Sequence, residues 1–123
     1  MTTKQEITTN IMIRCTSLNA ADFKEAIDLG LVCAAFDQQV NLIFIDGGIN
    51  NLITNQSAAN LRDKNHVDIL KGLEFYDIEH IFVEKESLEN SRLQIDNLLP
   101  NVQFISVSEV LELNLNADNL VTF

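Results

Sequence analysis

The sequence is poor in the residues that build metal sites and disulfide-linked proteins. Its 123 residues include two cysteines, two histidines, one proline and no tryptophan. Cys15 and Cys33 are too few for the disulfide framework of a small secreted domain, so we expect free thiols and a cytoplasmic protein. The first ten residues contain no apolar segment, which predicts no signal peptide. His66 and His80 have no metal-ligand spacing with each other or with either cysteine, and we expect no metal site.

Basic residues and long apolar runs are also scarce. There are 8 Lys and Arg residues against 18 Asp and Glu residues, a formal net charge of -10. Nucleic-acid binding relies on Lys and Arg that displace counterions from phosphates, so this balance disfavours direct nucleic-acid binding. No apolar run approaches the ~20 residues of a membrane-spanning helix, and we expect no membrane association. The length predicts a single domain over residues 1–123.

What the chain does contain is an alternation of apolar segments with the periods of strands and helices. Strands are expected at Thr9–Cys15, Val40–Ile45, Ile78–Val83, Val102–Ile105 and Leu120–Phe123, and helices at Ala20–Phe36, Ser57–Glu74 and Val107–Leu113, with a helical turn at Lys85–Glu89. Asn19 is a candidate N-cap, and Ser106 with Glu109 forms a capping box. The alternation predicts a three-layer, flavodoxin-like α/β fold, in which helices flank a five-stranded, mainly parallel sheet.

Two segments are more apolar than a single covered face requires. Leu29–Phe36 is apolar around the whole helix, which predicts a second cover besides the sheet, for example a partner subunit. Phe75–Ile78 places two aromatic residues between the end of a helix and a strand. Such a cluster is typical of packing, and it also fits a subunit interface.

The carboxyl ends of parallel strands are where such folds usually carry function. Asp46-Gly47-Gly48 follows the second strand, but it matches neither G-x-G-x-x-G nor the P-loop pattern. A tight turn is therefore the simpler interpretation, and a small-anion or nucleotide site at Asp46–Asn51 stays an alternative.

Thiols and carboxylates are the other candidates for chemistry. Cys15 ends the first predicted strand and is a candidate reactive thiol, although a buried strand residue is the favoured interpretation. Cys33 lies within a helix among apolar neighbours and is interpreted as an inert small hydrophobic residue. Glu84 and Glu86 follow the third strand, but no histidine accompanies them, and solvated carboxylates are the plainer interpretation.

The stretch from Lys71 to Val83 resembles the TusC/DsrF branch of the DsrE/DsrF-like sulfur-relay family. Further matching segments are Glu25–Asp28, Leu42–Gly47, Leu52–Ile53, Ser87–Leu88 and Asp118–Phe123. Together they extend over most of the chain. The resemblance implies a five-stranded parallel sheet and a subunit that joins TusB-like and TusD-like (DsrH-like and DsrE-like) chains in a heterohexamer of two heterotrimers.

Complexes of this family pass persulfide sulfur towards 2-thiolation of the wobble uridine of certain tRNAs or, in sulfur oxidisers, take part in sulfur trafficking. The transferring cysteine belongs to the TusD or DsrE subunit, on the loop after its third strand. The matching position here is Glu84, in a stretch, Val83–Leu88, that contains no sulfur. A carboxylate cannot hold a persulfide, and its charge would raise the pKa of a nearby thiol. The resemblance therefore implies a non-catalytic subunit without a cofactor and with only an indirect link to tRNA.

Overall fold

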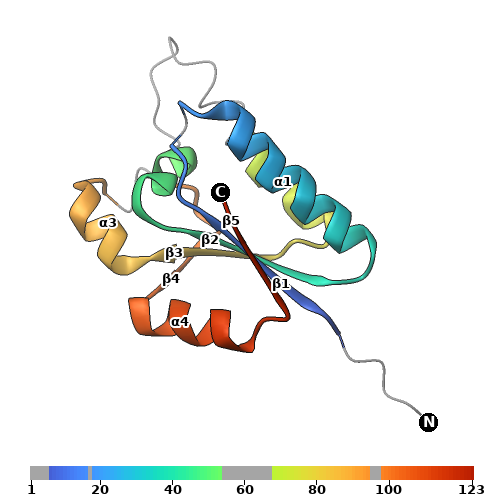
Figure 1. The fold of residues 1–123 in the computed structure, drawn as a ribbon. Coiled ribbons are helices and arrows are strands. Elements are labelled where there is room, and N and C mark those ends of the chain that lie inside the picture. Colours follow the sequence, from blue (N-terminus) through green and yellow to red (C-terminus); the bar gives the residue numbers. More distant parts are fainter. Residues whose placement is uncertain (1–5, 17, 54–67, 95–97) are drawn as a thin grey trace.

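A single five-stranded sheet organises the chain, with its strands in the order β4-β3-β2-β1-β5 (Figure 1). The computed structural model describes residues 6–16, 18–53, 68–94 and 98–123. The strands are β1 (Thr8–Ile13), β2 (Gln39–Phe44), β3 (His80–Glu84), β4 (Gln103–Ile105) and β5 (Asn119–Thr122). Every neighbouring pair is parallel, so the predicted α/β class is confirmed and the sheet is wholly parallel.

Helical segments cover both faces of the sheet. They are α1 (Ala20–Ala35), α3 (Lys85–Ser91) and α4 (Val107–Asn116), with two 3-10 helices, η1 (Asp46–Leu52) and η2 (Leu73–Tyr76). Figure 1 shows α1 on one side of the sheet and α4 on the other. The larger apolar core lies on the α1 side and includes Ile11, Leu42 and Val83, whereas a smaller cluster around Ile43 and Val110 lies under α4.

The start of α1 agrees with the sequence prediction, and its second half is partly exposed. The Asn19 side chain accepts a hydrogen bond from the Asp22 backbone N–H at 3.3 Å, which confirms the predicted N-cap. The helix ends at Ala35, one residue before the predicted end, and Asp37 then adopts a left-handed conformation with φ of 62°. Val32 is 54% exposed and Phe36 75% exposed. The described residues therefore do not supply the second cover that the sequence predicts for this half of α1.

Backbone hydrogen bonds explain where the strand predictions were wrong. The first strand stops at Ile13 instead of Cys15, because the N–H groups of Arg14 and Cys15 both donate to the carbonyl of Phe123. The third strand begins at His80 instead of Ile78, whose N–H closes the η2 turn by donating to the Leu73 carbonyl at 3.2 Å. The other strand limits agree with prediction to within one residue.

The helix limits differ more. Most of the predicted helix at 57–74 lies outside the described residues, but residues 68–71 are helical and η2 follows, so the helix ends earlier than predicted. The predicted turn at 85–89 is a helix, α3, that continues to Ser91. The last helix runs three residues beyond Leu113, and its predicted capping box between Ser106 and Glu109 is present.

Candidate functional site

The helical segments that follow β2 and β3, η1 and α3, meet at the carboxyl edge of the sheet, where Ser87 of α3 joins them. The Ser87 hydroxyl donates to Glu84 Oε1 at 2.5 Å and accepts from the Asp46 backbone N–H at 2.9 Å. Ser87 is only 5% exposed, so its hydroxyl holds the Glu84 carboxylate against the body of the protein. The carboxylate at the end of β3 is thus held in one position. That Glu84 corresponds to the cysteine of sister subunits stays a prediction.

Glu86 of α3 contacts the start of α4. Both oxygens of its carboxylate lie 3.2 Å from the backbone N–H of Val107, the first residue of α4. A negative charge at this position stabilises the helix, because the N-terminus of a helix carries partial positive charge. Glu109 adds a second carboxylate there, and its pKa is lowered by hydrogen bonds from the Ser106 backbone N–H and hydroxyl. The predicted solvated carboxylates after β3 therefore have structural partners.

The glycines after β2 pack against the first strand. A Cβ added to Gly48 would lie 1.9 Å from the backbone oxygen of Ile13, and one added to Gly47 would lie 2.8 Å from a methyl group of Thr16. The two residues therefore allow close approach between η1 and the end of β1, as the turn interpretation requires. Asp46, which precedes them, forms an exposed ion pair with Arg14 at 3.2 Å. The alternative of an anion or nucleotide site at 46–51 is not needed to explain these glycines.

Cys15 lies in the loop after β1 and is held through its backbone. Its N–H donates to the Phe123 carbonyl at 3.2 Å, and its carbonyl accepts from Nδ2 of Asn51 at 2.9 Å. Partial burial, together with the negative charge of Asp22, raises the pKa of the Cys15 thiol above its ordinary value. A thiolate, which is the nucleophilic form, is therefore disfavoured at this position. The candidate role of Cys15 as a reactive thiol stays a prediction that these features oppose.

The remaining candidates are spread over the molecule. Cys33 is a free, partly buried cysteine that packs on the main core. The His80 ring stacks on Phe82 with the centroids 6.0 Å apart, and His66 lies outside the described residues. Within the described part of the chain, no three His, Cys, Asp or Glu side chains are grouped so that they could hold a metal ion.

The hydrogen-bonding roles of four polar residues escaped the sequence prediction. Ser87 and Glu86 act through hydrogen bonds to other segments, which no local pattern reveals. Asn10 and Asn41 are buried side by side in the sheet, where Asn41 Nδ2 donates to Asn10 Oδ1 at 2.9 Å. Asn10 in turn donates to the Leu113 carbonyl of α4 at 3.0 Å. A signal existed for these two, since asparagine is unusual in the middle of a buried strand.

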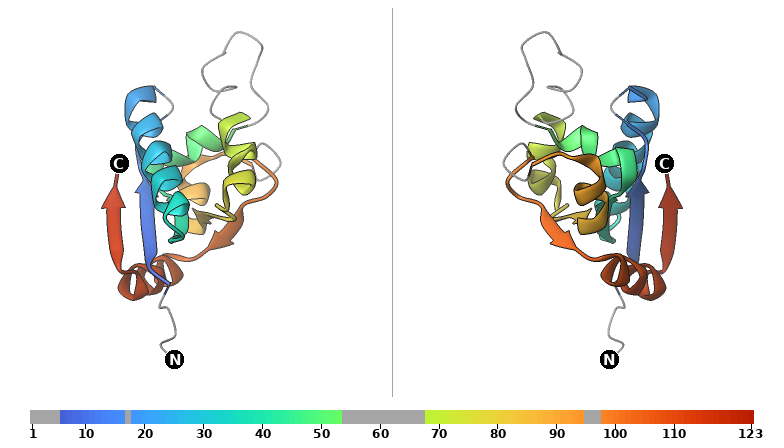
Figure 2. Two further views of the ribbon diagram at one scale, coloured as in Figure 1. Left: turned by 90° about the vertical axis from the view of Figure 1, so that its right-hand side faces the viewer. Right: turned by 90° about the vertical axis from the view of Figure 1, so that its left-hand side faces the viewer.

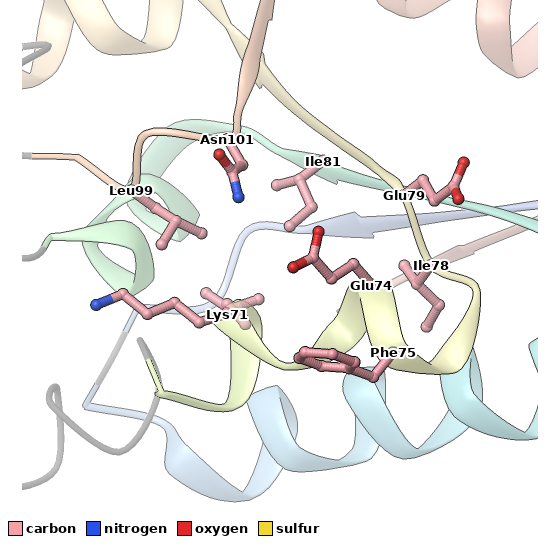
Figure 3. Close-up of a pocket in the computed structure, with 9 residues that line it drawn as sticks. Lys71, Glu74, Phe75, Ile78, Glu79, Ile81, Leu99 and Asn101 are labelled. Carbon is pink, nitrogen blue, oxygen red and sulfur yellow. The ribbon is translucent and has the colours of Figure 1, made fainter.

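Aromatic and apolar side chains are exposed on the α1 side of the molecule. Phe75 is 82% exposed and Tyr76 63% exposed on η2, which packs beside α1. We call these two residues, together with Val32 and Phe36 of α1, the aromatic surface. Beside it lies a groove of about 520 Å³ with an apolar base that includes Leu70, Ile78, Ile81 and Leu99. Figure 3 shows the Glu74 carboxylate turned into this groove.

These features define the class of protein: a three-layer α/β domain with a parallel sheet, whose strand β3 ends in a carboxylate held by a hydrogen bond. The solved structure of the ychN protein from E. coli has the same fold, with a TM-score of 0.74 at 11% identity over 97% of this chain and 100% of the other. The chain belongs to the DsrE/DsrF-like family, whose model matches residues 11–123.

Two relatives connect the chain to the branch that its sequence resembles. A TusC homolog from Vibrio parahaemolyticus is 30% identical over 112 residues, which cover 91% of this chain and 95% of the relative. The intracellular sulfur oxidation protein DsrF from Allochromatium vinosum is 35% identical over 75 residues, or 61% of this chain and 55% of the relative. In the described residues, no helix is both long and apolar enough to cross a membrane.

Proposed function

We propose that this chain is a non-catalytic subunit of a cytoplasmic sulfur-relay complex, in which TusB-like and TusD-like chains are its partners. The observation that carries the proposal is the end of β3, where Ser87 of α3 holds the Glu84 carboxylate at 2.5 Å. Persulfide transfer needs a thiolate that attacks and then carries sulfur, and a carboxylate does neither. The names of the relatives, TusC homolog and DsrF, support the same role.

The two cysteines do not replace the missing nucleophile. The Cys15 thiol has a raised pKa because it is partly buried and lies near Asp22, so little thiolate forms at neutral pH. Cys33 lies in the last turn of α1 and packs on the apolar core. The proposal therefore assigns the transferring cysteine to a TusD-like partner and leaves this chain a part in assembly.

The aromatic surface supports the assembly role. Phe75, Phe36, Tyr76 and Val32 are all more than half exposed, and large apolar side chains gathered on one side are typical of protein interfaces. With a net charge of -10, the chain itself is not expected to hold tRNA. Its contribution to 2-thiolation of the tRNA wobble uridine, or to sulfur trafficking, runs through its partners.

Reconstitution with the TusB-like and TusD-like chains of the same genome tests the proposal. We expect a stable complex on size-exclusion chromatography, and sulfur transfer from a persulfide donor that stops when the cysteine of the TusD-like chain is replaced by serine. The double variant Cys15→Ser/Cys33→Ser of this chain should support full transfer. Added sulfur on this chain in mass spectrometry, lost in Cys15→Ser, would instead assign the chemistry to Cys15.

A further inference from the structure

A second apolar surface lies on α4, on the opposite face of the sheet from the aromatic surface. Val110 of α4 is buried against the sheet and Leu113 packs against the same cluster. Val107, Leu111 and Leu115, spaced four residues apart, are 47%, 59% and 76% exposed. Residues with this spacing form one stripe along a helix. The stripe is therefore a solvent-facing apolar flank of α4.

The stripe lies on the flank of α4 that is turned away from β3. The other flank carries Glu109 and Asn116, which line a pocket of about 220 Å³ together with Phe82 of β3. Leu120 of β5 adds to the apolar surface, because it pairs in register with Asn10, whose side chain bonds to α4 from the same sheet face. Leu120 is 48% exposed. We call Val107, Leu111, Leu115 and Leu120 the α4–β5 surface.

The strand that borders this surface is an unprotected sheet edge. β5 is outermost in the sheet, and Figure 2 shows its outer side free of other elements. All four of its residues, Asn119–Thr122, are exposed. Natural proteins usually guard such an edge with lysine, proline, a bulge or a covering segment. The sequence Asn-Leu-Val-Thr has neither lysine nor proline, and no described segment covers it, which favours cover by another chain.

The charges around the surface indicate what kind of chain that is. Residues 107–123 contain no Lys, Arg or His. Asp118 lies directly before β5, Glu109 and Glu112 lie on the pocket flank of the same helix, α4, and the whole chain has a net charge of -10. Two copies facing each other here would bring acidic residues together, whereas a basic partner would be attracted. The charge pattern therefore disfavours a second copy of this chain and favours a different protein.

We propose that the α4–β5 surface binds a different protein chain, which presents apolar side chains within a rim of Lys and Arg. This inference rests on the proposed function, because the sister subunits of the complex are the candidates to fill the surface. The aromatic surface and the α4–β5 surface lie on opposite faces of the sheet, so one partner on each face leaves this chain between two neighbours.

Two adjacent residues of α4 provide a matched test. Leu115→Asp and Asn116→Asp add the same charge to the same exposed helical turn, but only Leu115 belongs to the surface. Binding of each purified variant to the immobilised TusB-like and TusD-like chains is measured by interferometry at several salt concentrations. We expect Leu115→Asp to weaken binding about tenfold or more, as loss of a central apolar contact does. Asn116→Asp should bind like the unaltered chain, and salt should weaken binding of all three.

The possible failures are distinguishable. If the unaltered chain binds neither sister chain, the proposed function fails and this inference with it. If it binds and Leu115→Asp binds equally well, only the α4–β5 inference is overturned. If light scattering shows that the chain alone forms a dimer that Leu115→Asp dissociates, the surface belongs to a second copy and the inference is also overturned. Circular dichroism of both variants checks that the fold is intact, which is expected because both side chains are exposed.

Discussion

The contact between Gly48 and β1 gives the sharpest prediction of stability. In Gly48→Ala the new Cβ would lie 1.9 Å from the Ile13 backbone oxygen and 2.7 Å from its carbonyl carbon, whereas real contacts of this kind exceed 3.0 Å. The two segments must therefore separate by about 1 Å, and backbone atoms cannot move aside as a flexible side chain does. The Ile13 oxygen also accepts the Ile45 N–H at 3.1 Å, and this bond would be strained by the same movement.

The expected cost follows from these two effects. Overpacking a dense interior costs typically 1–3 kcal/mol, and weakening a backbone hydrogen bond adds about 1 kcal/mol. We therefore expect Gly48→Ala to lower the free energy of unfolding by about 3 kcal/mol. For a domain of this size, that corresponds to a melting temperature lower by roughly 10 °C. Urea unfolding and thermal melting, both followed by circular dichroism, measure the two quantities.

Gly72→Ala is the matched control. Gly72 has an ordinary right-handed conformation with φ of -86°, and a Cβ added there would have its nearest neighbours at 3.6 and 3.8 Å. The alanine fits and reduces the entropy of the unfolded chain, so we expect stabilisation of about 0.4–1 kcal/mol. If Gly48→Ala falls within about 1 kcal/mol of the unaltered protein, the close packing of η1 on β1 is refuted as the reason for glycine at this position.

Three further predictions concern single side chains. Glu86→Ala should lower the free energy of unfolding by about 1 kcal/mol, because the N-terminus of α4 loses the carboxylate that α3 supplies. The control is Glu89→Ala, an exposed change on α3, the helix that also carries Glu86, and it should have almost no effect in urea unfolding. Glu109 has a lowered pKa in the folded state, so its stabilising effect is complete above the ordinary glutamate pKa and is lost as the pH falls through the folded value. The stability difference between the unaltered protein and Glu109→Gln should therefore shrink on acidification, and a constant difference would contradict this account. In a Cys33→Ser background, the pH midpoint for alkylation of Cys15 should be higher in the folded protein than in the unfolded chain. Asp22→Asn should lower this midpoint part of the way towards the unfolded value, and an unmoved midpoint would exclude Asp22 as a cause.

Local patterns in the sequence predicted the positions of the strands and helices well, but not the tertiary contacts that set their ends. The apolar run of β2 and the capping box of α4 were confirmed, because each depends on residues close together in the chain. The end of β1 was predicted two residues too late, since Phe123, more than a hundred positions away, takes the N–H groups of Arg14 and Cys15. The 3-10 helix η1 was missed, because its close fit to β1 is a tertiary contact of Gly48.

The candidate site was predictable only in its chemistry. The absence of sulfur at Glu84 and Ser87 can be read from the sequence, as can the two carboxylates of this segment, Glu84 and Glu86. The hydrogen bonds that fix Glu84 could not be predicted, because Ser87 joins segments from two different strands. The exposed stripe of α4 has a helical spacing, but its exposure follows from how the helix sits on the sheet through Val110.

The position of β5 has a consequence for how the protein is made. β1 lies in the interior of the sheet, yet one of its two neighbours, β5, follows more than a hundred residues later in the chain. During synthesis from the N-terminus, the edge of β1 stays open until residues 119–122 have emerged, and this pairing closes the longest loop of the fold. Leu120 takes its place beside α4 only at that moment. A partner that binds there would select chains whose sheet is complete, so assembly would follow completion of the sheet.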